Sequence, residues 1–270
     1  MYIDPVSDSP IRDVSDTAYL VAAQRAVESE RPDALFRDPY ARPLAGERGD
    51  AILARIPAPA RALSAWSVAI RTRVIDELIA AAIATGIDAI LDLGAGFDTR
   101  PYRMTLPPML RWIEVDTPAI LDPKTRALAA DAPVCQLERT TLDLADAAAR
   151  RRWLASITGR VLVLTEGVVP YLTVEQVGEL ADDLHAIARG WIAEYLAPSI
   201  VQRRRQSTLL ANAMWQFTPD DWFGFFAEHG WRAADTRFLV DEGVRLGRPA
   251  PVEPSGAPAA AYVLYAPQSR

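Results

Sequence analysis

The chain has 270 residues, of which 50% are hydrophobic and 24% are charged, a globular composition that excludes collagen-like, low-complexity and disordered chains. The net charge of −6 argues against a nucleic-acid partner, and the single cysteine, Cys135, excludes an internal disulfide framework and a cysteine-rich zinc site. With only two histidines, we expect no metal centre. The N-terminus has no secretory signal pattern, and no apolar run is long enough to span a bilayer. We therefore expect a cytoplasmic protein without a membrane partner.

The first part of the chain has the apolar spacing of helices. A helix is expected from Asp16, with Ser15 or Asp16 as its cap. A longer helix is expected over residues 64–85, with apolar residues on one face and Gly86 as its C-terminal stop.

After Gly86 the hydrophobic pattern changes to short apolar runs, which are typical of buried strands. Helical patterns lie between the strands, most clearly at residues 174–189. Strands that alternate with helices indicate a parallel sheet covered on both faces. The last strand is expected to be antiparallel. The expected strands are residues 89–93, 111–116, 134–137, 161–165, 191–196, 236–239 and 260–265.

We therefore predict a single α/β domain around a seven-stranded, Rossmann-like sheet that is mostly parallel. Its expected parts are an N-terminal helical cap (1–86), a cofactor-binding core (87–196), an acceptor lid (197–235) and closing strands (236–270). The lid is rich in Trp and Phe, some of which could line a pocket for a flat or apolar acceptor.

Two strand ends carry the chemistry, because ligands of open parallel sheets bind beyond the carboxyl ends of the strands. The first strand runs into a turn, Gly94-Ala95-Gly96, that lets a ligand approach the backbone, and the second ends at Asp116, which suits ribose hydroxyls. A dinucleotide fingerprint needs a glycine where Thr99 stands. Asp98 also places a negative charge where a pyrophosphate would lie, at a cost of about 1–4 kcal/mol at about 4 Å. A nucleoside without phosphate, such as S-adenosylmethionine, fits these residues better.

These residues belong to an ordered set of motifs that resembles the leucine carboxyl methyltransferase type of class I S-adenosylmethionine-dependent methyltransferase. That group includes actinobacterial O-methyltransferases of natural-product and polyketide pathways. The resemblance extends from about Asp16 to the last strand. The matching motifs are Arg25-Ala26-Val27-Glu28, Leu35-Phe36-Arg37-Asp38-Pro39-Tyr40-Ala41, Ile70-Arg71-Thr72-Arg73, residues 93–100, Glu114-Val115-Asp116-Thr117-Pro118 with Lys124, Leu142-Asp143-Leu144, and residues 166–172.

The resemblance implies a role for each matching position. On the acceptor side the candidates are Tyr171, His229 and Arg73, and no catalytic residue is assigned. Pro170 departs from the family's pattern, and residues 197–235 match no particular acceptor type. On the cofactor side, Arg71 would bind the carboxylate of the methionine part and Glu166 would face its ammonium group. The backbone of Gly94, Ala95 and Gly96 would lie close to the methionine part, and Asp98 and Thr99 continue that loop. Asp116 would bind the ribose, and Asp143 and Leu144 would contact the adenine.

The expected reaction is direct, in-line transfer of a methyl group to an oxygen of a small-molecule acceptor that is acidic and aromatic. A carboxylate is already ionised at neutral pH, so it needs positioning and desolvation rather than a base. The scarcity of histidine favours this acceptor and a methyl ester product. A phenol or other hydroxyl, with a pKa of about 10, would need a base or a nearby cation, and His229 is then the first candidate.

Two other classes stay open: an NAD(P)-dependent reductase, disfavoured by Asp98 and Thr99, and a non-catalytic scaffold that binds a partner through its N-terminal helices. The sequence is compatible with a homo-oligomer and does not identify the acceptor or its pathway.

Overall fold

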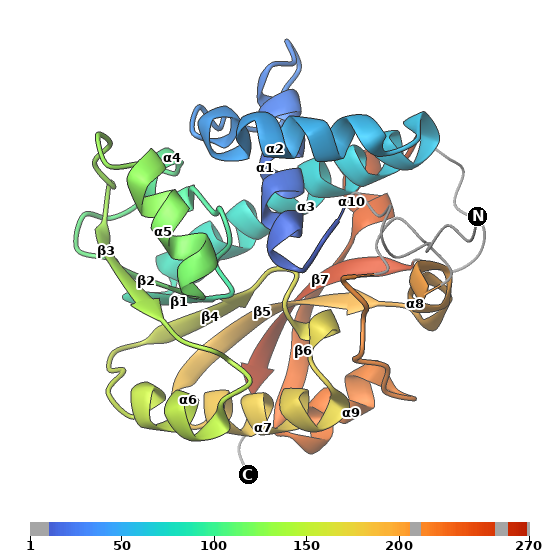
Figure 1. Ribbon diagram of the computed structural model, residues 1–270. Coiled ribbons are helices and arrows are strands. Elements are labelled where there is room, and N and C mark those ends of the chain that lie inside the picture. Colours follow the sequence, from blue (N-terminus) through green and yellow to red (C-terminus); the bar gives the residue numbers. More distant parts are fainter. Residues whose placement is uncertain (1–10, 206–211, 252–258, 269–270) are drawn as a thin grey trace, which may run out of the picture.

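A seven-stranded sheet forms the centre of the molecule in the computed structural model, which describes residues 11–205, 212–251 and 259–268 (Figure 1). The strand order is β3-β2-β1-β4-β5-β7-β6. The first five strands pair in parallel, whereas β7 is antiparallel to both β5 and β6. This confirms the predicted fold class. The strands are β1 Ala89–Leu93, β2 Arg111–Asp116, β3 Gln136–Thr141, β4 Val161–Thr165, β5 Ala188–Leu196, β6 Trp231–Phe238 and β7 Ala260–Pro267.

Helices cover both faces of the sheet (Figure 1). One face carries α1 (Ser15–Ser29), α2 (Ala41–Arg55), α3 (Ala58–Ala84) and α10 (Leu239–Arg245). The other face carries α6 (Ala147–Leu154), α7 (Val174–His185) and α9 (Trp222–Glu228). Because both faces are covered, every residue of β1 and β4 is buried, which explains their continuous apolar runs. The remaining elements are α4 (Arg100–Arg103), α5 (Pro118–Ala127), the 3₁₀ turn η1 (Val169–Tyr171) and α8 (Pro198–Arg205).

The strands at the two edges of the sheet differ from their predicted positions. Strand β3 begins at Gln136 rather than at Val134 and is polar, because its side chains alternate between partly buried and exposed positions. Strand β6 begins at Trp231, inside the segment predicted to be a lid, and most of its side chains are also outside the core. Edge strands pair on one side only, so neither needs the apolar run by which the central strands are found in the sequence.

The segment predicted as a lid divides into different parts. In α9, Trp222 and Phe226 join the core under the sheet, where Phe226 packs 5.2 Å, centroid to centroid, from Trp191 of β5. This helix therefore covers the sheet. Part of the predicted lid, residues 206–211, lies outside the described residues.

Of the two helix ends predicted in the N-terminal part of the chain, one is confirmed and the other is wrong. Gly86 follows α3 with a φ of 92°, a left-handed conformation that suits glycine, as predicted. The expected cap of α1 is wrong, because the N-cap is Val14, whose side chain makes no capping hydrogen bond. Asp16 is buried instead, and its carboxylate lies 2.5 Å from Arg48 of α2. The carboxylate therefore joins two helices.

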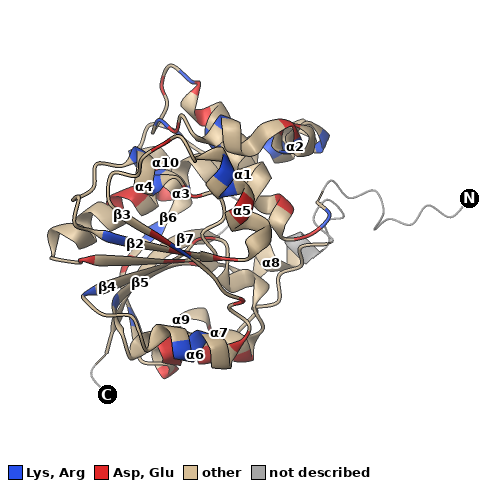
Figure 2. Cartoon of the chain, turned by 60° about the vertical axis from the view of Figure 1, so that its left-hand side comes forward, with Lys and Arg blue, Asp and Glu red and all other residues tan. Residues whose placement is uncertain are grey.

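Helices α6 and α7 carry charged residues of both signs (Figure 2). Arg150 and Arg151 of α6 both contact Asp183 of α7, at 2.7 and 2.9 Å. These pairs hold the two helices side by side on the outer surface. Across the described ranges, no helix combines the length and the hydropathy needed to cross a membrane.

Candidate active site

A cavity of about 450 Å³ lies at the carboxyl ends of β1, β2, β4 and β5, where the sheet topology predicts a ligand site. Helix α1, helix α3 and strand β7 complete its walls. The volume is in the range that holds a cofactor or other small ligand. Of the predicted cofactor-binding residues, the cavity brings together Arg71, Gly94, Ala95, Gly96, Asp98, Asp116, Asp143, Leu144 and Glu166.

The glycine turn after β1 has a conformation that requires glycine. Gly94 and Gly96 have φ angles of 68° and 50°, and a Cβ on Gly94 would lie 2.4 Å from Cγ2 of Val168. The backbone N–H groups of Gly94 and Ala95 donate to the carbonyl of Val115 on β2, at 2.7 and 3.1 Å. The turn is therefore fixed to β2 and packed closely against the loop after β4.

Asp116 and the loop after β3 form one end of the cavity. The Asp116 carboxylate accepts from the backbone N–H of Gly96 at 2.8 Å and from that of Thr117 at 2.7 Å. A carboxylate has about four acceptor positions, so both oxygens can still accept from ribose hydroxyls. Leu142 and Leu144 supply apolar walls suited to a flat base, and the Asp143 carboxylate fixes their loop by accepting from Ala145 N–H at 2.9 Å. These residues fit an adenosyl group.

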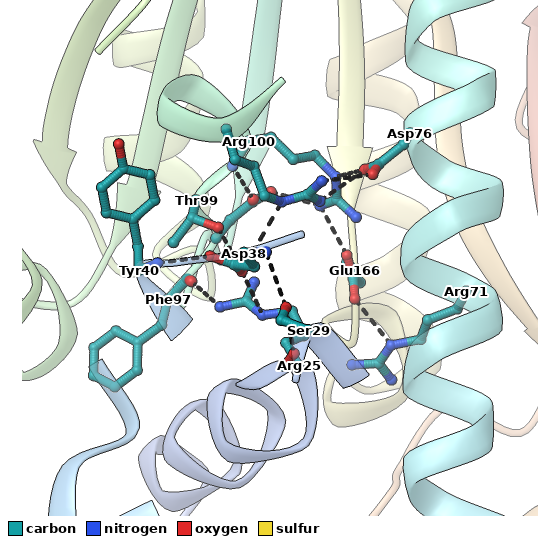
Figure 3. Close-up of polar contacts among 12 residues, drawn as sticks. Arg25, Ser29, Asp38, Tyr40, Arg71, Asp76, Phe97, Thr99, Arg100 and Glu166 are labelled. Atoms are coloured by element: carbon teal, nitrogen blue, oxygen red, sulfur yellow. Dashed lines mark hydrogen bonds and ion pairs between the residues drawn. The ribbon is translucent and has the colours of Figure 1, made fainter. Parts of the chain in front are cut away.

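A buried network of arginines and carboxylates lies behind the turn (Figure 3). Arg100, which is 1% exposed, contacts Asp76 at 2.7 Å, Asp98 at 2.6 Å and Glu166 at 3.0 Å. Arg71 reaches from α3 to Glu166, with Nε 2.9 Å from Oε1. Burial opposes the ionisation of Glu166, but Arg100 and Arg71 outweigh it and lower the pKa of that carboxyl. The site thus presents a guanidinium and a carboxylate side by side, which suits the zwitterionic end of an amino acid.

Asp98 and Thr99 behave differently from the prediction. The Asp98 carboxylate accepts from the backbone N–H of Arg100 at 2.8 Å as well as from its guanidinium. Burial opposes its ionisation, and Arg100 outweighs that effect and lowers the pKa of Asp98. The negative charge of Asp98 is therefore compensated by Arg100. Contrary to the prediction from its position in the sequence, Asp98 does not exclude a pyrophosphate. Thr99 lies behind the turn, fully buried, and its hydroxyl donates to Asp38 at 2.7 Å. The described lining of the cavity does not include Thr99.

Two residues of the N-terminal motifs have roles that the sequence did not assign. Asp38 contacts Arg25 at 3.4 Å as well as Thr99 (Figure 3). Arg25 lines the cavity from α1 and donates a hydrogen bond to the carbonyl of Phe97. These contacts attach the helical cap to the glycine turn. Arg25 and Asp38 belong to two of the motifs that carry the family resemblance. The sequence did not show that their side chains are in contact.

The acceptor-side candidates separate into one residue at the cavity and two away from it. Tyr171 lines the cavity together with Trp215. His229 lies at the end of α9, with Nδ1 3.3 Å from Asp182 of α7, so it is not available to an acceptor in this cavity. Arg73 contacts Glu77 on α3 at 2.9 Å. Residues two positions apart on a helix point in different directions, so Arg73 leaves the cavity that Arg71 enters.

Glu194 is a further cavity residue that sequence reasoning missed. It lies near the end of β5, is 3% exposed and accepts through Oε1 from the backbone N–H of Val168 at 3.0 Å. Its Oε2 is buried and has no hydrogen-bond partner in the part of the chain that the structure describes. The available signal was a glutamate within the apolar run of β5, since glutamate is almost never fully buried without a reason.

Comparison with known proteins identifies the family of the chain. The sequence profile of the family described as leucine carboxyl methyltransferase matches residues 18–185. A protein from Streptomyces coelicolor, named as an S-adenosyl-L-methionine-dependent methyltransferase, is 35% identical and covers 86% of this chain and 88% of its own length. A protein with the same kind of name from Streptomyces avermitilis is 34% identical, covering 88% of this chain and 89% of its own.

Two solved structures show the same fold. A protein from Thermobifida fusca described as a methyltransferase has a TM-score of 0.58 and 19% identity, covering 92% of this chain and 94% of its own. A DUF574 family protein from Streptomyces avermitilis has a TM-score of 0.58 and 17% identity, covering 92% and 97%. With a matching profile over more than half of its length and relatives that are more than 30% identical, the chain belongs to the leucine carboxyl methyltransferase family of S-adenosylmethionine-dependent methyltransferases.

Proposed function

We propose that this methyltransferase acts on an oxygen of a small acidic natural product and forms a methyl ester on its carboxylate. The observation that carries the proposal is the lack of a ready base: the described residues that line the cavity include no histidine. The Glu194 carboxyl lines the cavity near Arg71 and Tyr262. Burial raises its pKa to about 8, so it holds its proton at neutral pH. A carboxylate acceptor needs no base, because it is ionised already.

The residues that would hold the cofactor are those of the glycine turn and its surroundings. Arg71 and Glu166 would bind the amino-acid end, Asp116 the ribose, and Leu142 with Leu144 the adenine. When bound, S-adenosylmethionine would supply an electrophilic methyl carbon, which an acceptor oxygen takes up while the sulfur keeps the electron pair of the broken bond.

The chain's own contribution on the acceptor side is to exclude water and to orient the carboxylate. Tyr171, Trp215 and Leu239 bring apolar surface to the cavity beside Arg71. Removing water from a carboxylate makes it a stronger nucleophile, and holding it in one orientation lowers the entropic part of the barrier. Neither contribution requires a residue that gains or loses a proton.

The experiment is a methyl-transfer assay with labelled cofactor and a panel of aromatic carboxylic acids and their matched phenols, 2-naphthoate and 2-naphthol among them. The expected product is an ester, whose label is released by mild alkali. Label that appears only in alkali-stable ethers would contradict the carboxylate acceptor.

A hydroxyl acceptor is the second candidate, and Glu194 is the observation that favours it. Above about pH 8 the Glu194 carboxyl is ionised and could accept the proton of a phenol. In that case ether formation would increase with pH, and the same panel would show it.

A further inference from the structure

We propose that Glu194 is a specificity residue of the acceptor site: its protonated carboxyl donates a hydrogen bond from Oε2 to the carboxylate of the acceptor. The inference rests on the proposed function, since it takes the acceptor to be a carboxylate. It assigns to Glu194 a direct contact with the ligand.

The fold places Glu194 on the cavity side of the sheet. In the antiparallel pairing of β5 and β7, Glu194 lies opposite Tyr262, so both side chains project from the same face. That face packs against α3, and both residues line the cavity next to Arg71. The neighbouring residue Ala193 belongs to the core on the opposite face. Glu194 and Leu196 are thus the residues of β5 that line the cavity.

The unpartnered oxygen of Glu194 favours the protonated form, although the backbone N–H groups of Glu194 and Val168 act to lower the pKa of the carboxyl. Oε1 accepts from Val168 N–H, which either form of the carboxyl can do. Oε2 is buried, and the described residues offer it no hydrogen-bond partner. An ionised Oε2 would be a buried charge without donors, which is costly, whereas a protonated Oε2 lacks only one acceptor. A ligand carboxylate supplies that acceptor.

The charged groups around Glu194 lead to the same protonation state. Burial raises the pKa of Glu194 to about 8; Arg71 on α3 acts to lower it, and Glu166 after β4 acts to raise it. Tyr262 faces it from β7, and burial raises the pKa of Tyr262, so that phenol stays neutral. A pKa of about 8 keeps the Glu194 carboxyl mainly protonated at neutral pH. An anionic ligand nearby favours that form further.

A buried donor at this place separates two classes of acceptor. A carboxylate receives the hydrogen bond as a charged partner, which makes it strong. A neutral hydroxyl is a weaker acceptor, and a ligand without an acceptor group leaves the Glu194 proton unpaired. The site therefore selects anionic acceptors at neutral pH.

Two substitutions test the donor directly. In Glu194→Gln the amide oxygen can accept from Val168 N–H, and the NH₂ group can donate in place of the protonated Oε2. In Glu194→Ala the donor is lost. We expect 2-naphthoate to bind the S-adenosylhomocysteine complex of Glu194→Gln within about threefold of wild type at pH 7, and that of Glu194→Ala about ten- to a hundredfold more weakly, by titration calorimetry.

The pH dependence supplies the second readout. Since 2-naphthoate is ionised throughout, its affinity for the wild-type complex should fall up to tenfold per pH unit above about pH 8, and that fall should be absent in Glu194→Gln. Glu179→Gln, on an exposed part of α7, is the matched control and should follow wild type. The affinity of each variant for S-adenosylhomocysteine shows that the fold and the cofactor end are intact.

Three outcomes would overturn the inference: Glu194→Gln binding as weakly as Glu194→Ala at pH 7, a wild-type affinity that does not fall above pH 8, or 2-naphthoate binding no more tightly than 2-naphthol. A failure of the proposed function is a different result. There, bound carboxylates would follow the predicted Glu194 dependence but receive no methyl group. Conversely, ester formation without any dependence on Glu194 would leave the proposed function standing and remove the donor role.

Discussion

The two ends of the cavity differ in how far the chain satisfies its own polar groups. At the cofactor end, Asp116 accepts from two backbone N–H groups, and Asp98 and Glu166 are paired with Arg100. At the proposed acceptor end, one oxygen of Glu194 is buried without a partner among the described residues. A paired group is held in place before any ligand arrives, whereas an unpaired one gains most when a ligand completes it. The cofactor end is therefore preorganised, and the acceptor end is where a ligand can be selected.

The largest expected effect comes from breaking the preorganised end. In Arg100→Met the carboxylates of Asp76, Asp98 and Glu166 lose their shared cation in a buried site, and we expect a loss of about 3–5 kcal/mol in the free energy of unfolding. Urea denaturation measures it. The control is Arg73→Met, which removes a partly exposed pair with Glu77 and should cost at most about 1 kcal/mol. Equal losses in the two variants would show that the network is not what holds this end.

The pH dependence of stability tests the unpaired end without any ligand. Because burial raises the pKa of Glu194 from about 4.3 in the unfolded chain to about 8, the folded state binds the proton more tightly. Its contribution to stability is complete below about pH 4.3, is lost as the pH rises toward 8 and is constant above that. Wild type should therefore lose stability relative to Glu194→Gln over this interval, by up to about 1.4 kcal/mol per pH unit, in urea denaturation. Parallel curves for the two proteins would mean that Glu194 titrates normally.

The glycine turn gives a matched pair of substitutions within the cofactor end. Gly96→Ala adds a left-handed alanine with no close contact and should cost about 1–2 kcal/mol of stability. Gly94→Ala adds the same strain and also places its Cβ 2.4 Å from Val168, so it should cost more and weaken S-adenosylhomocysteine binding. Thermal unfolding and calorimetry measure the two effects. If the two variants are equally stable, the contact with Val168 is not tight in solution.

The last expected effect is confined to binding and leaves the stability of the fold unchanged. Asp116→Ala removes the proposed ribose partner, and we expect S-adenosylhomocysteine to bind more weakly by about 1–3 kcal/mol in titration calorimetry. Asp122→Ala, an exposed position on the neighbouring α5, serves as the control and should bind as wild type does. An unchanged affinity in Asp116→Ala would remove that residue from the cofactor site.

How well the sequence predicted each part depended on burial and on distance along the chain. Strands β1, β2 and β4 were predicted with the bounds that the structure shows, because each is a short apolar run that ends at a polar residue or a turn. The edge strands β3 and β6 were misplaced because they are polar. All of the cofactor-side candidates except Thr99 lie at the cavity. Of the acceptor-side candidates, Tyr171 lies there, whereas His229 and Arg73 do not.

The sequence by itself determined the α/β class, the glycine turn and the acid at the end of β2, because each of these depends on residues close together in the chain. The tertiary structure alone decided the partners of Arg100, which lie 24 and 66 residues away at Asp76 and Glu166. It also placed Glu194 opposite Tyr262, across a strand pairing that no local pattern encodes. Charge compensation and burial arise from contacts between distant segments, so the protonation state of a carboxyl follows from the fold and not from its neighbours in sequence.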